Sequence, residues 1–136
     1  VPRRCIQVSR ISPMYRAIIL LVLLCSNALA HEMTPTYPKW SVSHIPGAHK
    51  TTMKMFNKRA EVKWYEIGVF TKDFQPIPFV SKFKIIHIPY LGHVTFDVYI
   101  SSANIKRTEY ICSMSKLRGA INNQAMIATK ICSRLK

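Results

Sequence analysis

The segment Val94-Thr95-Phe96-Asp97-Val98-Tyr99-Ile100 decides the fold class of this 136-residue chain. Its even-numbered residues are apolar, and its odd-numbered residues are Thr, Asp and Tyr. A period of two is typical of a β-strand with one face in the core and the other in water. Its apolar face therefore needs a second layer to cover it.

Other short segments share this alternation or are dense in β-branched and aromatic residues, with Pro- or Gly-marked turns between them. They are residues 52–57, 61–70, 79–88, 108–115 and 125–134. Segment 61–70 is apolar on both faces, which favours a central strand covered on both sides, and Gly68 marks a bulge. Segment 125–134 also suits a short helix. Several short strands without a long helical period predict an all-β sandwich.

Residues 14–30 are typical of a secretory signal peptide. Arg16 is followed by an apolar run, and Ala28-Leu29-Ala30 is the small-x-small pattern that a signal peptidase cuts after. The mature chain then begins at His31. The apolar run is shorter than the roughly 20 residues that span a membrane, so we expect no permanent span.

The first residues leave alternatives open. Residues 1–13 are either a gene-model extension or a basic n-region, and Met14 alone starts a complete signal peptide. A lipoprotein acylated at Cys25 is the other export route, and Leu24 argues against it because such sites have a small residue there. After the signal peptide we expect a Pro-rich lead-in, 31–50, and one sandwich domain, 51–136.

The mature chain is strongly basic. Cleavage removes four of the 20 Lys and Arg and none of the six acids, which leaves 16 against 6 and a net charge of +10. This balance favours an anionic surface as partner, or only keeps the protein soluble. The charges are scattered along the chain, which makes nucleic acid an unlikely partner.

Two cysteines remain after cleavage, Cys112 and Cys132. An even count in an exported chain predicts a disulfide. If the last two strands form a hairpin with these residues opposite each other, the turn falls at Asn122-Asn123, where Asn tolerates the backbone of a tight turn. The spacing is not Cys-x-x-Cys, which favours a structural bridge over a redox pair.

The string Tyr110-Ile111-Cys112, with Trp64 upstream, resembles the Tyr-x-Cys of strand F and the strand-C Trp of immunoglobulin-like domains. The resemblance implies a single immunoglobulin-like antiparallel β-sandwich. It departs from that family because the partner, Cys132, lies later in the chain and not on an earlier strand.

Residues 52–115 also resemble the amino-terminal domain of periplasmic pilus-assembly chaperones, with Asn57 after the first strand and a Pro-rich loop after the next. We expect no second domain, so the resemblance does not carry chaperone activity over. Residues 31–38 resemble uncharacterised small exported proteins of marine bacteria and their phages.

His31 carries an alternative hypothesis. As the first mature residue it would hold an α-amine beside an imidazole, and such a pair chelates copper when a second His completes the site. Lytic polysaccharide monooxygenases and some periplasmic copper proteins start in this way, and the chain resembles them in this feature alone. The candidate second ligands are His44, His49, His87 and His93, of which we favour His93 because a turn position is free to reach.

No common enzyme motif is present, neither Gly-x-Ser-x-Gly, His-Glu-x-x-His nor a phosphate-binding Gly-rich loop. Four aromatic residues, Trp40, Tyr65, Tyr90 and Tyr99, are candidates for an exposed partner or carbohydrate surface. The sequence favours a small exported, non-enzymatic binding or assembly module without a cofactor, whose partner is another protein or an anionic surface. The alternatives are a periplasmic copper protein using His31 and a cationic factor for membranes or nucleic acid.

Overall fold

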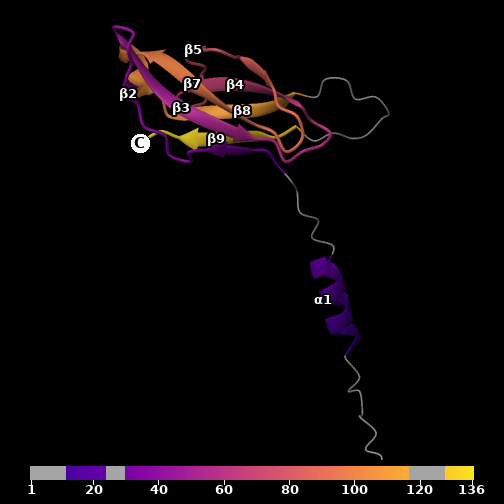
Figure 1. Cartoon of the computed structure of the whole chain (residues 1–136). Coiled ribbons are helices and arrows are strands. Elements are labelled where there is room, and N and C mark those ends of the chain that lie inside the picture. Colours follow the sequence, from indigo (N-terminus) through magenta and orange to yellow (C-terminus); the bar gives the residue numbers. More distant parts are fainter. Residues whose placement is uncertain (1–11, 24–29, 117–127) are drawn as a thin grey trace, which may run out of the picture.

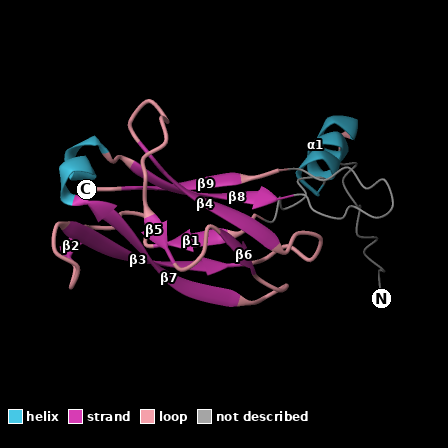
Figure 2. Ribbon diagram, turned by 90° about the horizontal axis from the view of Figure 1, so that it is seen from above, coloured by secondary structure: helices cyan, strands magenta, loops and turns pink. Residues whose placement is uncertain are grey.

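Two antiparallel β-sheets, called sheet A and sheet B here, pack face to face (Figures 1 and 2). The computed structural model describes residues 12–23, 30–116 and 128–136. The expected all-β sandwich is confirmed. Residues 1–11, the cleavage motif up to Leu29, and the expected turn at Asn122-Asn123 lie outside the described residues.

Sheet A has five strands in the order β1-β3-β7-β5, and β2 pairs with β3 as well. The strands are β1 (Glu32–Thr34), β2 (Ser41–Val42), β3 (Ala48–Phe56), β5 (Val80–Ser81) and β7 (His93–Ser101). Sheet B has four strands in the order β6-β4-β8-β9. They are β4 (Trp64–Phe70), β6 (Ile85–His87), β8 (Tyr110–Lys116) and β9 (Lys130–Arg134). A 3-10 helix, η1 (Ser102–Arg107), leads from β7 towards β8.

The pairing of β3 with β7 follows the alternation in their sequences. The two strands pair along their whole length, from Ala48 opposite Ser101 to Phe56 opposite His93. Met53 and Phe96 face each other on the buried side, whereas Thr52 and Asp97 face each other on the solvent side. A one-residue slip would turn all buried side chains to water, so the pattern sets the register.

The core lies between the sheets. Its members are mostly aliphatic and sulfur-containing side chains from both sheets, together with the ring of Tyr65. They are Met33, Met53, Met55, Val62, Tyr65, Ile67, Val69, Ile77, Ile86, Ile88, Phe96, Val98, Ile100 and Ile111. Because Met33 of β1 belongs to this core, β1 is part of the sandwich and not of a separate lead-in. The expected domain boundary at residue 51 falls inside β3.

Three details differ from the sequence-based expectations. Segment 79–88 forms two short strands in different sheets, because β5 pairs with β7 and β6 pairs with β4. The register of β4 with β8 runs unbroken through Gly68 opposite Cys112, so there is no bulge at Gly68. Among the described residues, no further layer covers the outer face of β4, and Trp64 is 37% exposed there.

The region around the apolar run of residues 17–25 contains a helix, α1 (Pro13–Leu23). Apolar side chains along it are exposed, among them Met14, Ile18 and Leu20. None of the helices in the described part of the chain is long and apolar enough to cross a membrane.

Candidate functional site: the edge of sheet B and its surroundings

Cys112 and Cys132 lie directly opposite each other on β8 and β9 and form a disulfide. The predicted pairing and register are therefore confirmed. The bond joins an edge strand, β9, to its neighbour. Because β9 is at the edge of sheet B, this covalent link fixes the position of a strand that has only one sheet neighbour.

Two further contacts hold β9 in place. The ammonium group of Lys130 lies 4.5 Å from the ring centre of Phe70 and 4.7 Å from that of Phe74. The ring of Phe74 is stacked on Tyr110 of β8, with 4.9 Å between the centroids. Cation–π contacts of this kind are worth about 0.5–1 kcal/mol each at exposed positions. At the other end of β9, Arg134 Nε donates to Glu109 at 2.7 Å.

The free side of β9 is only partly hydrogen-bonded. The amide of Arg134 donates to the carbonyl of Thr36, and the amide of Lys136 donates to that of Pro38. Amides on one side of a strand belong to alternate residues, so those of Lys130 and Cys132 face the same way. Within the described residues, no strand register pairs Lys130 or Cys132 on that side, and no turn or loop backbone accepts a hydrogen bond from their amides. Two successive positions of an edge strand thus lie outside any regular strand pairing on that side.

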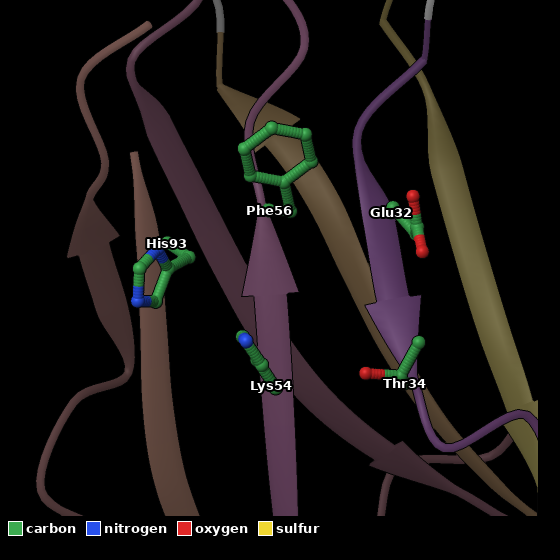
Figure 3. Close-up of a pocket in the computed structure, with 5 residues that line it drawn as sticks. All are labelled: Glu32, Thr34, Lys54, Phe56 and His93. Carbon is green, nitrogen blue, oxygen red and sulfur yellow. The ribbon is translucent and has the colours of Figure 1, made fainter. Parts of the chain in front are cut away.

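β1 lies next to this open part of β9 (Figure 1), and Figure 3 shows the two ribbons side by side at the edge of sheet A. β1 is fastened to β3 through only three residue pairs. Odd-numbered residues of β3 direct their N–H and C=O groups to β7, so its even-numbered residues direct them to β1. The bonded partners in β1 are therefore Glu32 and Thr34, and the backbone groups of Met33 point to the other side, towards β9. No register joins β1 to β9 within the described residues.

His31, directly before β1, anchors this strand to sheet B. Its ring is buried, with 2% exposed. Its Nε2 atom shares a hydrogen bond with Ser113 Oγ at 2.6 Å, and its Nδ1 atom shares one with Thr129 Oγ1 at 3.2 Å. The ring also packs on Tyr65, with 4.6 Å between centroids. Burial is the main reason that the pKa of His31 is lowered to about 4. The charge of Arg59 acts in the same direction, and a hydrogen bond with the backbone of Ser113 opposes the shift, so the ring is neutral at pH 7.

A buried amide supports the neighbouring loop. Asn57 Nδ2 donates to the carbonyls of Val62 at 2.7 Å and Ile88 at 2.9 Å. Its Oδ1 atom accepts from the amide of Arg59 and from the hydroxyl of Tyr65. Every hydrogen-bonding position of this side chain is used, which is what a fully buried amide requires.

The structure does not bring His31 and His93 together. His93 is exposed and lies on the outer face of sheet A, opposite Phe56, whereas His31 points into the core. Both ring nitrogens of His31 are already hydrogen-bonded. A copper ion shared by these two side chains does not fit this arrangement. The described residues contain no group of three or more His, Cys, Asp or Glu side chains that could hold a metal ion.

The other candidate residues are scattered. His87 lies in β6 against Trp64, and His44 lies near Tyr99. His49 Nδ1 is hydrogen-bonded to Ser102 Oγ. Of the four aromatic residues expected on the surface, Tyr65 is fully buried, because it fills the core under His31. Trp40 packs against the core, and Tyr90 is 51% exposed.

The arrangement of two such sheets defines an immunoglobulin-like sandwich. No family model matches the chain, and no curated protein sequence matches it. Among solved structures, the chain is similar to the Escherichia coli chaperone DraB, with a TM-score of 0.61 and 12% sequence identity. The match covers 78% of this chain and 53% of DraB, so the chain spans about half of that chaperone. The expected likeness to a pilus-chaperone sandwich is confirmed for the fold.

Proposed function

We propose that this protein is a small exported, non-enzymatic binding or assembly module that takes up an extended segment of a partner protein along β9. The observation that carries the proposal is the edge of β9, which the disulfide joins to β8 and whose amides at Lys130 and Cys132 lie outside any strand pairing in the described part of the chain. An extended segment can add to such an edge through main-chain hydrogen bonds.

The added segment would lie where β1 now borders β9. Neighbouring strands are about 4.8 Å apart, so β1 has to move aside by roughly that distance. Three residue pairs with β3 and the buried ring of His31 oppose this movement. His31 therefore sets how readily the edge opens, while the disulfide keeps β9 itself in place.

Three observations support export and partner binding. Residues 14–30 have the pattern of a cleaved signal peptide, and the Cys112–Cys132 bond suits an oxidising compartment. The similar fold of DraB belongs to a protein described as a chaperone. We expect the partner to be another protein, and the basic surface to favour an acidic one.

Peptide selection tests this proposal. The mature chain, residues 31–136, is used to select binders from a library of random twelve-residue peptides. Each selected peptide is then tested against Lys130→Pro and its matched control Lys130→Ala. Both variants lose the contacts of the lysine side chain, but only the proline loses the amide on the open edge. Proline is tolerated as the first residue of an edge strand, so both variants should fold.

The proposal expects peptides with alternating apolar residues that shift the amide resonances of Lys130 and Cys132. Binding should persist in Lys130→Ala and be lost in Lys130→Pro. Equal binding to both variants, with unfolding midpoints that match, would remove β9 as the site. A failure to select any peptide above the background of bare resin would count against a strand-binding function altogether.

A further inference from the structure

The second edge of the sandwich, along β7, is more open than the edge of β9. β7 has nine residues, but β5 pairs only with Tyr99 and Val98. After Ser81 the chain leaves sheet A and crosses to sheet B, where β6 pairs with β4. The stretch of β7 from His93 to Asp97 therefore has no strand beside it within the described residues.

Hydrogen bonds show which backbone groups face this edge. The amide of Asn57 donates to the carbonyl of Gly92, and the amide of Ser102 donates to Gly47, so even-numbered positions of β7 face β3. On the other side, Ser81 Oγ donates to the carbonyl of Asp97 at 2.8 Å. Odd-numbered positions therefore face outwards. In the described part of the chain, the N–H and C=O groups of His93 and Thr95 lie outside any strand pairing on this side, and no turn or loop backbone bonds to them.

Two hollows lie near β7. One, at the open edge, has a volume of about 310 Å³ and is lined by Lys82, Phe83, Thr95, Phe96, Asp97 and Tyr99. The other, also of about 310 Å³, lies on the outer face of sheet A across β1, β3 and the start of β7, and is lined by Glu32, Thr34, Lys54, Phe56 and His93 (Figure 3). The first hollow gives an added strand space for side chains beside the backbone edge.

The acidic groups near these hollows are already paired within the protein. Asp97 accepts from Thr52 Oγ1 at 2.5 Å and lies 3.6 Å from the ammonium group of Lys50. Glu32 is paired with Lys58 at 2.7 Å.

Two lysines near the edge remain available. Among the described residues, Lys54 and Lys82 make no ion pair, although Lys82 lies over the ring of Phe83. Lys54 is directly opposite Thr95 in the register. A strand added to β7 would lie two strand spacings from β3, about 9.6 Å, which Lys54 and a Glu side chain can span together. The unbalanced charge at this edge is positive.

We propose that the edge of β7 from His93 to Asp97 is a second binding site, which takes an extended, acidic segment of a protein partner. The segment bonds to the backbone of His93 and Thr95 and directs carboxylates towards Lys54 and Lys82. This site is separate from the edge of β9, so it goes beyond the proposed function and does not depend on it. An assembly module with both edges in use can hold two chains at once.

Charge and backbone chemistry argue for this occupant. A second copy of the chain would bring the same lysines to the same edge, and like charges that face each other across two strands are unfavourable. A nucleic acid would satisfy the lysines but offers no strand backbone for the open amides. A protein segment with alternating acidic residues satisfies both.

The test uses synthetic peptides of the sequence Thr-Glu-Val-Glu-Val-Glu-Val-Thr with blocked ends, titrated into the mature chain at low salt and followed by amide resonances. One control peptide has Gln in place of every Glu. Two others carry N-methyl groups, on the amides of the Glu residues in one and on those of the Val residues in the other. In each methylated peptide the blocked amides lie on one side of the strand.

The proposal expects shifts at the amides of His93 and Thr95. Methylation of one set of peptide amides should abolish binding, and methylation of the other set should spare it. This comparison uses the unaltered protein, so it does not depend on how a variant folds. Thr95→Pro should lose binding that Thr95→Ala keeps. Lys54→Gln and the Gln peptide should each bind about two- to five-fold more weakly, as expected for loss of an exposed ion pair.

Several results would overturn the proposal. Equal effects of both methylation patterns would show that charge alone holds the peptide. Displacement of the acidic peptide by single-stranded DNA, together with peptide binding that survives in Thr95→Pro, would show the same. Shifts confined to Lys130 and Cys132, with loss in Lys130→Pro, would place the peptide on β9 and leave the proposed function intact. If sedimentation showed a dimer of the wild-type protein that is absent in Thr95→Pro, the occupant of this edge would be a second copy of the chain and not an acidic segment.

Discussion

Acidification should destabilise this protein chiefly through His31. The pKa of its ring is lowered from 6.5 to about 4 by burial, so the unfolded chain binds a proton at a pH where the folded chain does not. The folded state therefore loses stability as the pH falls from about 6.5 towards 4, and the loss is complete below 4. A difference of 2.5 in pKa corresponds to about 3.4 kcal/mol in total, of which about 2.5 kcal/mol is lost by pH 4.5.

The carboxylates act at lower pH. Hydrogen bonds at Glu61, to a backbone amide and to Arg59, lower its pKa, and the hydroxyl of Thr52 does the same for Asp97. Their stabilising effect is present above the ordinary values of 4.5 and 3.8 and is lost below them. Between pH 6.5 and 4.5, the change in the free energy of unfolding therefore reports mainly on His31.

The assay is chemical unfolding of the oxidised mature chain at half-unit intervals between pH 7 and 4.5. The wild type should lose about 2.5 kcal/mol over this range. His31→Gln, which cannot titrate, should start less stable and show a nearly flat profile. The reasoning is refuted if the wild type changes by less than about 1 kcal/mol, or if the variant has the same slope. His93→Gln, at an exposed position, serves as the matched control, because the loss is assigned to His31 alone.

Three further changes test the contacts that hold the sandwich together. Replacing Cys112 and Cys132 by Ser should lower the free energy of unfolding by about 2–5 kcal/mol in urea titrations, because the disulfide restricts the conformations of the unfolded chain. A loss below about 1 kcal/mol would contradict that explanation. Gly68→Ala should cost about 1–3 kcal/mol in the same assay, because the new methyl group would lie 2.6 Å from the ring of Phe70; an unchanged midpoint would mean that the ring moves freely. Asn57→Ala should cost more than about 3 kcal/mol in thermal or chemical unfolding, because it leaves several buried groups without partners, and a mild effect would imply that water replaces the amide.

The sequence predicts those parts of the fold in which one local pattern and one long-range constraint agree. The alternation in 94–100 is preserved in β7, and the shared register of Cys112 and Cys132 is preserved in β8 and β9. In both cases the same residues specify a strand and its partner, so few alternatives remain.

The remainder depends on where the chain changes direction. Nothing in the alternation of 79–88 indicates that Lys82 to Lys84 crosses from one sheet to the other, yet this crossing leaves the edge of β7 open. His31 was interesting in the sequence as a free amino terminus, whereas the structure uses it as a buried anchor. The available signal is that His31 lies two residues before the apolar residue Met33, which puts both on the same face of an extended chain. Its partners Ser113 and Thr129 are too far along the chain to be recognised from this pattern.

The anchor at His31 also has a consequence for the order in which the protein can fold. Ser113 and Thr129 lie 82 and 98 residues further along the chain. A chain that emerges amino terminus first, from a ribosome or through a translocation pore, presents His31 long before these partners. The strand β1 must therefore wait, unanchored, until the chain has emerged as far as Thr129. During that interval the core is incomplete and its strand edges are exposed, which is when an unfinished β-sheet protein is most prone to pair with the wrong chain.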